Sequence, residues 1–151
     1  QLIFSIVICL MTGMVGSLVT TPVIKTWYGQ IIKPSFNPPN WIFAPVWTIL
    51  FILMGIALFL IWQKGLQNKA VRFSFWLFIV HLLVNALWSY IFFGWHMIGL
   101  ALVNIIVLWI TIVWLIFRFY TIDKRAAYLL IPYILWVSFA SILNFYILYL
   151  N

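Results

Sequence analysis

Acidic residues are nearly absent from this chain: among 151 residues, Asp123 is the single acid against eight lysines and arginines. One carboxylate excludes paired-carboxylate catalysis, and no acid in an apolar segment could orient the histidine of a Ser-His-acid triad. Two histidines and one cysteine, Cys9, are too few for a metal site of clustered ligands. No P-loop or dinucleotide fingerprint occurs. Any chemistry here must therefore use the reactivity of a ligand or of the ten tryptophans.

Charge of either sign is scarce as well. Only 6% of the residues are charged and 68% are hydrophobic, with a mean hydropathy of +1.21. A water-soluble domain of this size could not bury so much apolar surface, so the chain is predicted to be an integral membrane protein. The net charge of +7 comes from bases at the ends of apolar runs, where they anchor helices at the membrane surface. The expected partner is the lipid bilayer and not a nucleic acid.

Five apolar runs remain when the chain is divided at its clusters of charge, proline and glycine. Each has about 19 to 25 residues, enough to cross a hydrocarbon core of roughly 30 Å as a helix. Helices are expected because hydrocarbon offers unpaired backbone groups no partner. We therefore predict an all-α integral membrane fold, a five-helix bundle in a single domain, 1–151. The predicted helices are 2–20, 44–62, 73–93, 98–119 and 126–150, and the long first connection is 21–43.

The distribution of basic residues predicts an orientation. The second and fourth connections hold six of them, and the opposite side holds two, Lys25 and Lys33. Since short cytoplasmic loops carry the excess of Lys and Arg, the N-terminus is expected inside and the C-terminus outside. We expect a multi-pass protein of a bacterial cell membrane, with the first connection on the outer face.

The first connection and the start of the second helix carry four prolines in the stretch KPSFNPPNWIFAPVW. Prolines fix φ and push the preceding residue toward extended geometry, so this segment can cross the end of the bundle without a ladder of hydrogen bonds. Its aromatic residues can stack on a planar ligand. They are Trp27, Tyr28, Phe36 and Trp41. We predict that the connection acts as a lid, with Trp47 and Phe51 one helical turn apart directly below it.

Polar residues recur on one face of the third predicted helix. His81, Asn85 and Ser89 are spaced by four, with Trp88 beside them. Polar side chains in a membrane helix face the bundle interior, where they bind a ligand or join helices by hydrogen bonds, and both roles stay open for Asn85. His81 could also bind haem iron, but a bis-histidine site needs a partner at the same depth, and His96 is predicted in a loop.

One face of the fifth predicted helix combines a proline, an indole, a small residue and an amide. Four-residue steps place them there: Pro132, Trp136, Ala140 and Asn144. Asn144 is more simply explained as a contact between helices than as a ligand contact. On the first helix Cys9, Gly13 and Ser17 form a stripe of small residues, which could serve dimerisation or packing within the bundle.

Three spaced motifs resemble a known family. WYGQIIKPSFNPPNWIFAPVWTILF, NALWSYIFFG and LLIPYILWVSFASILNF look like those of the TspO/MBR family, the tryptophan-rich sensory proteins related to the mitochondrial translocator protein. The resemblance covers nearly the whole chain. It implies a tight, commonly dimeric five-helix bundle with no covalent cofactor. The implied ligands are porphyrins, such as protoporphyrin IX or haem, and in some relatives sterols and benzodiazepine-type drugs.

The resemblance also implies a set of site residues. Ligand-binding residues fall on Trp27, Tyr28, Pro38, Pro39, Trp47, Asn85, Trp88, Trp136 and Ala140, to which we add Phe43 and Phe51 beside Trp47. Some members are reported to degrade porphyrin in light, which would give Trp47 and Trp136 a catalytic, photochemical role. A porphyrin or lipid carrier without catalysis is the alternative. A sterol role is not expected, since no Lys or Arg follows Tyr146 or Tyr149.

Overall fold

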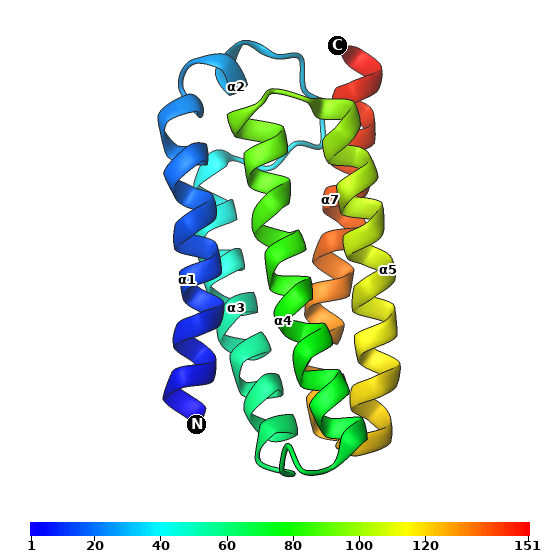
Figure 1. Ribbon diagram of the computed structural model, residues 1–151. Helices are drawn as coiled ribbons and strands as arrows, with labels where there is room; N and C mark the ends of the chain where they lie inside the picture. Colours follow the sequence, from blue (N-terminus) through cyan, green and yellow to red (C-terminus); the bar gives the residue numbers. More distant parts are fainter.

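The computed structural model describes residues 1–151 and consists of helices and their connections, without strands. Five helical segments are long and apolar enough to cross a membrane, and they stand side by side as a bundle (Figure 1). The predicted all-α, five-helix membrane fold is thereby confirmed. The elements are α1 (Leu2–Thr20), η1 (Thr21–Val23), α2 (Trp27–Gln30), α3 (Asn40–Trp62), α4 (Lys69–Ser89), η2 (Tyr90–Gly94), α5 (Ile98–Ile122), α6 (Lys124–Leu129) and α7 (Ile131–Leu150).

Helix bounds differ from the predicted ones where local capping acts. The helix predicted as 73–93 begins earlier, at Lys69, because Asn68 Oδ1 accepts hydrogen bonds from the N–H groups of Ala70 (2.8 Å) and Val71 (3.4 Å). The predicted helix 98–119 continues to Ile122 and ends at Asp123, whose backbone is extended. Arg118 lies within this helix, with its guanidinium over the Phe73 ring. Charge alone therefore does not end these helices.

Proline lies inside one of the two other helices whose bounds differ from the prediction, and it follows a break in the other. The helix predicted as 44–62 begins at Asn40 and contains Pro45. Membrane helices tolerate a proline when neighbouring groups satisfy the backbone carbonyl that loses its N–H partner. The helix predicted as 126–150 is instead two helices, α6 and α7, which meet at Leu130. Pro132 follows that junction and has no N–H to continue the ladder of α6.

A close contact between helices joins α1 to α3 in the half of the bundle remote from the lid. A Cβ atom on Gly55 would lie 2.5 Å from the Ile6 Cα atom, so only glycine allows this approach. Higher on α1, Cys9 is fully buried and a Cβ on Gly13 would meet the Phe51 ring at 2.6 Å. The Cys9 and Gly13 positions of the small-residue stripe thus serve packing within the bundle.

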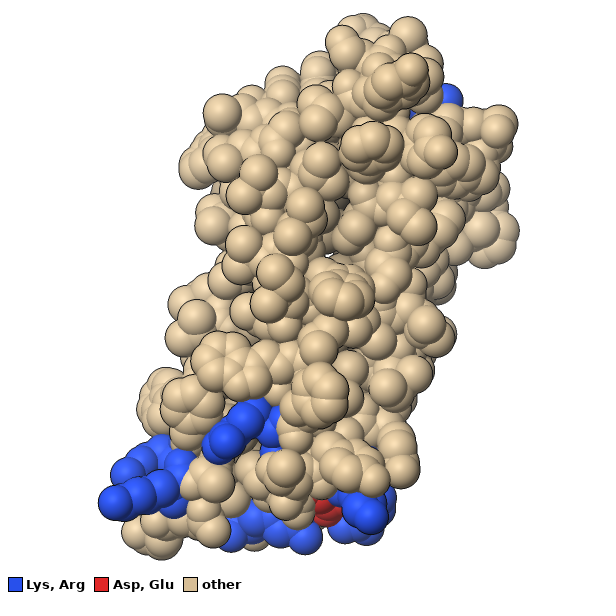
Figure 2. Space-filling view, turned by 90° about the vertical axis from the view of Figure 1, so that its right-hand side faces the viewer, with Lys and Arg blue, Asp and Glu red and all other residues tan.

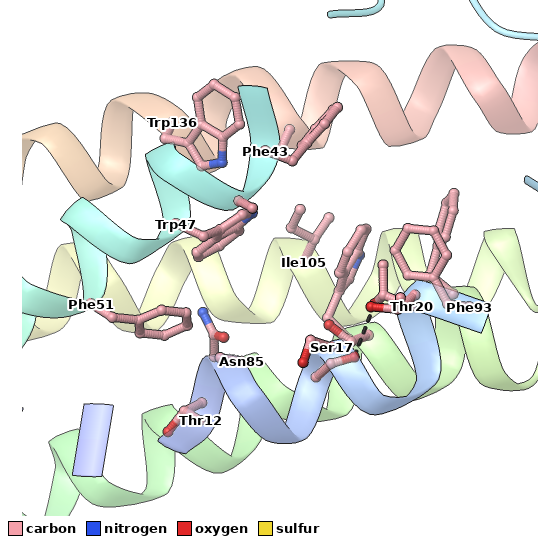
Figure 3. Close-up of a pocket in the computed structure, with 18 of the residues that line it drawn as sticks. Thr12, Ser17, Thr20, Phe43, Trp47, Phe51, Asn85, Phe93, Ile105 and Trp136 are labelled. Atoms are coloured by element: carbon pink, nitrogen blue, oxygen red, sulfur yellow. Dashed lines mark hydrogen bonds between the residues drawn. The ribbon is translucent and has the colours of Figure 1, made fainter. Parts of the chain in front are cut away.

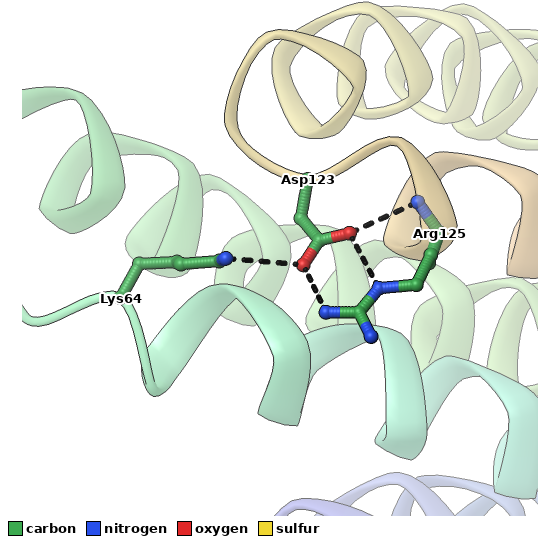
Figure 4. A network of polar contacts seen from close by, with 3 residues as sticks. All are labelled: Lys64, Asp123 and Arg125. Atoms are coloured by element: carbon green, nitrogen blue, oxygen red, sulfur yellow. Dashed lines mark hydrogen bonds and ion pairs between the residues drawn. The ribbon is translucent and has the colours of Figure 1, made fainter.

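The lone acid lies at the end of the bundle that holds most of the basic residues (Figure 2). Asp123 caps α6 by accepting from the Arg125 N–H (3.0 Å), and its carboxylate contacts the Arg125 guanidinium (3.0 Å) and Lys64 Nζ (3.3 Å), as Figure 4 shows. The hydrogen bonds from Arg125 are the main cause that lowers the Asp123 pKa to about 2. This network joins the α3–α4 connection to the start of α6.

Candidate ligand cavity

A cavity of about 510 Å³ occupies the half of the bundle beneath the first connection. It lies between α1, α3, α4, α5 and α7, and 17 of its 28 lining residues are hydrophobic. This volume falls within the range of about 300–1,000 Å³ that is usual for small-molecule sites. Eight of the eleven ligand-binding residues expected from the sequence line it: Tyr28, Phe43, Trp47, Phe51, Asn85, Trp88, Trp136 and Ala140.

Aromatic rings form two walls of the cavity (Figure 3). On α3, Trp47 stacks on Phe51 with ring centroids 5.5 Å apart. Across the cavity mouth, Phe43 meets Trp136 of α7 edge to face at 5.9 Å. The spacing of four residues places Trp47 and Phe51 on one helical face, whereas the pairing of α3 with α7 comes from tertiary packing. Together these rings present flat apolar surface to a ligand.

Trp27, Pro38 and Pro39 do not line the cavity. The Trp27 indole instead stacks on the His96 ring, with centroids 4.1 Å apart and planes within 9°. Pro39 precedes α3 in extended geometry and directs the chain into that helix. The structure therefore places these three residues in the support of the first connection rather than in the wall of the cavity.

The first connection crosses the end of the bundle from α1 toward α7 (Figure 1). Asn151 holds it there: its Oδ1 accepts from the Ile32 N–H (3.0 Å), and its Nδ2 donates to the Ile32 carbonyl (2.8 Å). Tyr28 is buried and donates to Asn37 Oδ1 (3.3 Å), and burial raises the pKa of this hydroxyl. The first connection is thus tied to the end of the chain after α7 through Ile32 and is cross-linked within itself by Tyr28 and Asn37.

A chain of four polar side chains lies behind the cavity. Asn85 Nδ2 donates to the Tyr133 hydroxyl (2.7 Å), which lies 2.9 Å from His81 Nε2, and His81 Nδ1 lies 2.7 Å from Thr111 Oγ1. Both ring nitrogens of His81 are thus engaged in hydrogen bonds within the protein, and His81 does not line the cavity. Sequence reasoning missed Tyr133, although its position one residue after Pro132 places it beside the polar face of the same helix.

Two further polar groups mark the α7 side. Asn144 Oδ1 accepts from Trp88 Nε1 and its Nδ2 donates to the Ile98 carbonyl, both at 3.1 Å, which confirms Asn144 as a contact between helices. Trp136 Nε1 is buried without a hydrogen-bond partner, and the side chain lines the cavity. Figure 3 shows this nitrogen on the edge of the indole that faces Trp47. The indole N–H of Trp136 is therefore a buried donor without a partner, and other parts of this side chain line the cavity.

The wall formed by α1 was not predicted. Besides Leu10 and Met14, it consists of small and hydroxyl residues, namely Thr12, Gly13, Gly16, Ser17 and Thr20. Several lining residues on α1 and α3, among them Met14, Ser17 and Thr48, are also exposed on the outside of the bundle. The cavity consequently opens between these two helices toward the surroundings of the bundle. The signal available in the sequence was the run of small residues in the second half of the first helix.

The fold and the cavity define a multi-pass membrane protein with an aromatic ligand cavity under a lid. The model of the TspO/MBR family matches residues 5–150, and the chain belongs to this family. It is 46% identical to the tryptophan-rich protein TspO of Chlorobaculum tepidum, over 95% of this chain and 91% of that protein. It is 42% identical to the protein of that name from Archaeoglobus fulgidus, over 100% of this chain and 97% of that protein.

A human relative extends the comparison. The translocator protein of Homo sapiens is 36% identical, over 79% of this chain and 71% of that protein. Family membership together with these relatives supports a membrane sensor or receptor role.

Proposed function

We propose that the protein binds porphyrins, such as protoporphyrin IX or haem, and other planar hydrophobic ligands in the cavity beneath the lid. The observation that carries this proposal is the aromatic cavity itself. Trp47, Phe51, Phe43 and Trp136 offer flat faces from two different helices. Stacking on such rings adds roughly 0.5 to 1.5 kcal/mol per pair beyond the burial of apolar area. A flat, largely apolar macrocycle has the shape and polarity that these walls accept.

The position of the lid suggests where charged groups of such a ligand would lie. Lys25 and Lys33 belong to the connection above the cavity. Lys33 Nζ donates to the Ile31 carbonyl (3.1 Å) and lies 4.7 Å from the centroid of the Tyr28 ring, which itself lines the cavity. Porphyrin propionates would therefore be directed toward the lid, and the macrocycle toward Trp47. The count of basic residues separately predicts that the opposite end of the bundle, with six of them, faces the cytoplasm.

Quenching of tryptophan fluorescence by protoporphyrin IX in the dark tests this proposal. We expect saturable quenching in the wild type and weaker affinity in the double variant Trp47→Phe, Trp136→Phe. Trp114→Phe is the control, because Trp114 is exposed on α5 and does not line the cavity. Absence of saturable quenching would refute the porphyrin proposal. An equal loss of affinity in the Trp114 variant would refute the assignment of the cavity.

A second candidate function is light-driven degradation of the bound porphyrin. It is favoured by the two indoles, Trp47 and Trp136, that line one cavity. In this reaction the excited porphyrin loses one electron, which passes by way of a nearby indole to dioxygen; dioxygen is reduced to superoxide, and the porphyrin radical cation that remains is open to further oxidation. Loss of the porphyrin spectrum under illumination, in the wild type but not in the double variant, would support it. Saturable binding without that loss leaves a sensor or a carrier, and the homodimer implied by the resemblance stays a prediction.

A further inference from the structure

The polar chain behind the cavity has a direction, set by its last member. Thr111 Oγ1 donates its only proton to the Leu108 carbonyl (2.8 Å). It can then only accept from His81, so the imidazole proton lies on Nδ1 and His81 Nε2 accepts from the Tyr133 hydroxyl. The Tyr133 oxygen in turn accepts from Asn85 Nδ2. The amide oxygen of Asn85 is left without a partner in the protein.

The opposite direction would be less stable. If Thr111 donated to His81, every bond between the four side chains would persist with donor and acceptor exchanged, but the bond to the Leu108 carbonyl would be lost. One neutral hydrogen bond changes an equilibrium by up to about tenfold. The direction that ends at the Leu108 carbonyl is therefore preferred, and the polar chain presents the oxygen of Asn85, not its N–H groups, to the cavity.

Of the four side chains in the polar chain, only Asn85 reaches the cavity. Its side chain projects into the same space as Trp47 and Phe51 (Figure 3). Tyr133 and His81 are about 1% exposed and lie outside the lining, as does Thr111. A ligand in the cavity thus meets, beside the Ser89 hydroxyl of the same helix, the Asn85 amide, whose orientation is determined by residues that the ligand does not touch.

We infer that the cavity selects planar aromatic ligands that carry an N–H or O–H donor, and that Thr111, His81 and Tyr133 are positioning residues that set this preference through Asn85. A ligand without a donor would bury the Asn85 oxygen unpaired, which is unfavourable. The inference rests on the proposed use of the cavity as a ligand site. It does not require that the ligand be a porphyrin.

Carbazole and dibenzofuran are suitable probes, because both are planar tricycles of nearly equal shape and differ in one N–H against one ether oxygen. Binding is measured by titration calorimetry on the full chain in lipid nanodiscs, with empty nanodiscs as the blank. We expect the wild type to bind carbazole about tenfold more tightly. In Asn85→Leu this ratio should fall to about one.

Thr111→Val is the decisive variant. It removes the acceptor for His81 Nδ1–H, which makes the reversed chain competitive, so the carbazole-to-dibenzofuran ratio should fall to one or below. Thr121→Val is the matched control on the same helix, since Thr121 makes the same type of bond, to the Arg118 carbonyl (2.8 Å), outside the polar chain. Its ratio should equal that of the wild type.

Equal affinities in the wild type, or saturable binding of neither probe, would overturn the inference. An unchanged ratio in both Asn85→Leu and Thr111→Val would also overturn it. Failure of protoporphyrin IX to bind while carbazole selectivity persists would refute the porphyrin proposal alone. Asn85→Leu keeps the test decisive if Thr111→Val does not fold.

Discussion

Removing the Tyr133 hydroxyl tests the polar chain through stability. The Tyr133 side chain is about 1% exposed, and its single hydroxyl serves both Asn85 Nδ2 and His81 Nε2. Tyr133→Phe therefore leaves two buried polar atoms without partners. Each such atom costs about 1–3 kcal/mol, and the Asn85 amide can recover part of its loss by turning toward the cavity. We expect the free energy of unfolding to fall by about 2–3 kcal/mol.

The assay is reversible unfolding in mixed micelles with increasing SDS, followed by tryptophan fluorescence. Tyr149→Phe is the control, because Tyr149 is 76% exposed, and it should change the free energy of unfolding by less than about 0.5 kcal/mol. In an Asn85→Leu background the effect of Tyr133→Phe should shrink by about 1 kcal/mol, since one of the two orphaned atoms is gone. A loss of unfolding free energy below about 0.5 kcal/mol in the single variant would show that the Tyr133 hydroxyl does not bond both Asn85 and His81.

Three further predictions concern the fold and the lid. Gly55→Ala should lower the free energy of unfolding by about 1–2 kcal/mol in the same assay, because the clash with the Ile6 backbone exceeds the gain in helix propensity; unchanged stability would contradict it. Asn151→Ala should raise hydrogen exchange at the Ile32 amide about tenfold by mass spectrometry, since it removes both bonds to that residue, and an unaltered rate would mean that the lid is held elsewhere. Asp123 has a folded pKa of about 2, below its usual 3.8, so its stabilising contribution is complete above about pH 4 and is lost as the pH falls through about 2. Asp123→Asn should remove the part of the stability loss between about pH 4 and 2 that comes from this carboxylate, so its loss over that interval should be smaller than that of the wild type. An equal loss in the wild type and in Asp123→Asn would refute the assignment.

Much of the architecture could be predicted because it depends on local properties. The length and polarity of each apolar run determine that it crosses the membrane as a helix. Spacing by four placed Trp47 with Phe51 on one helical face, and the prolines of the first connection predicted an extended lid. The helix ends were less predictable, since they depend on single caps such as Asn68 and on whether a proline lies near a helix start.

What only the tertiary structure decided is how the helices are rotated and aligned against one another. Asn85 and Tyr133 are 48 residues apart in the chain, and nothing in the local sequence of either shows that they share a hydrogen bond. Likewise, the small residues of α1 became part of a cavity wall only because the packing of α1 against α3, close at Gly55 and at Gly13, leaves the face with Ser17 and Thr20 toward the cavity. The sequence by itself determined the membrane helices, the lid and the polar faces. The packing of glycine against backbone and the pairing of distant polar groups determined which faces meet and which atom of Asn85 a ligand encounters.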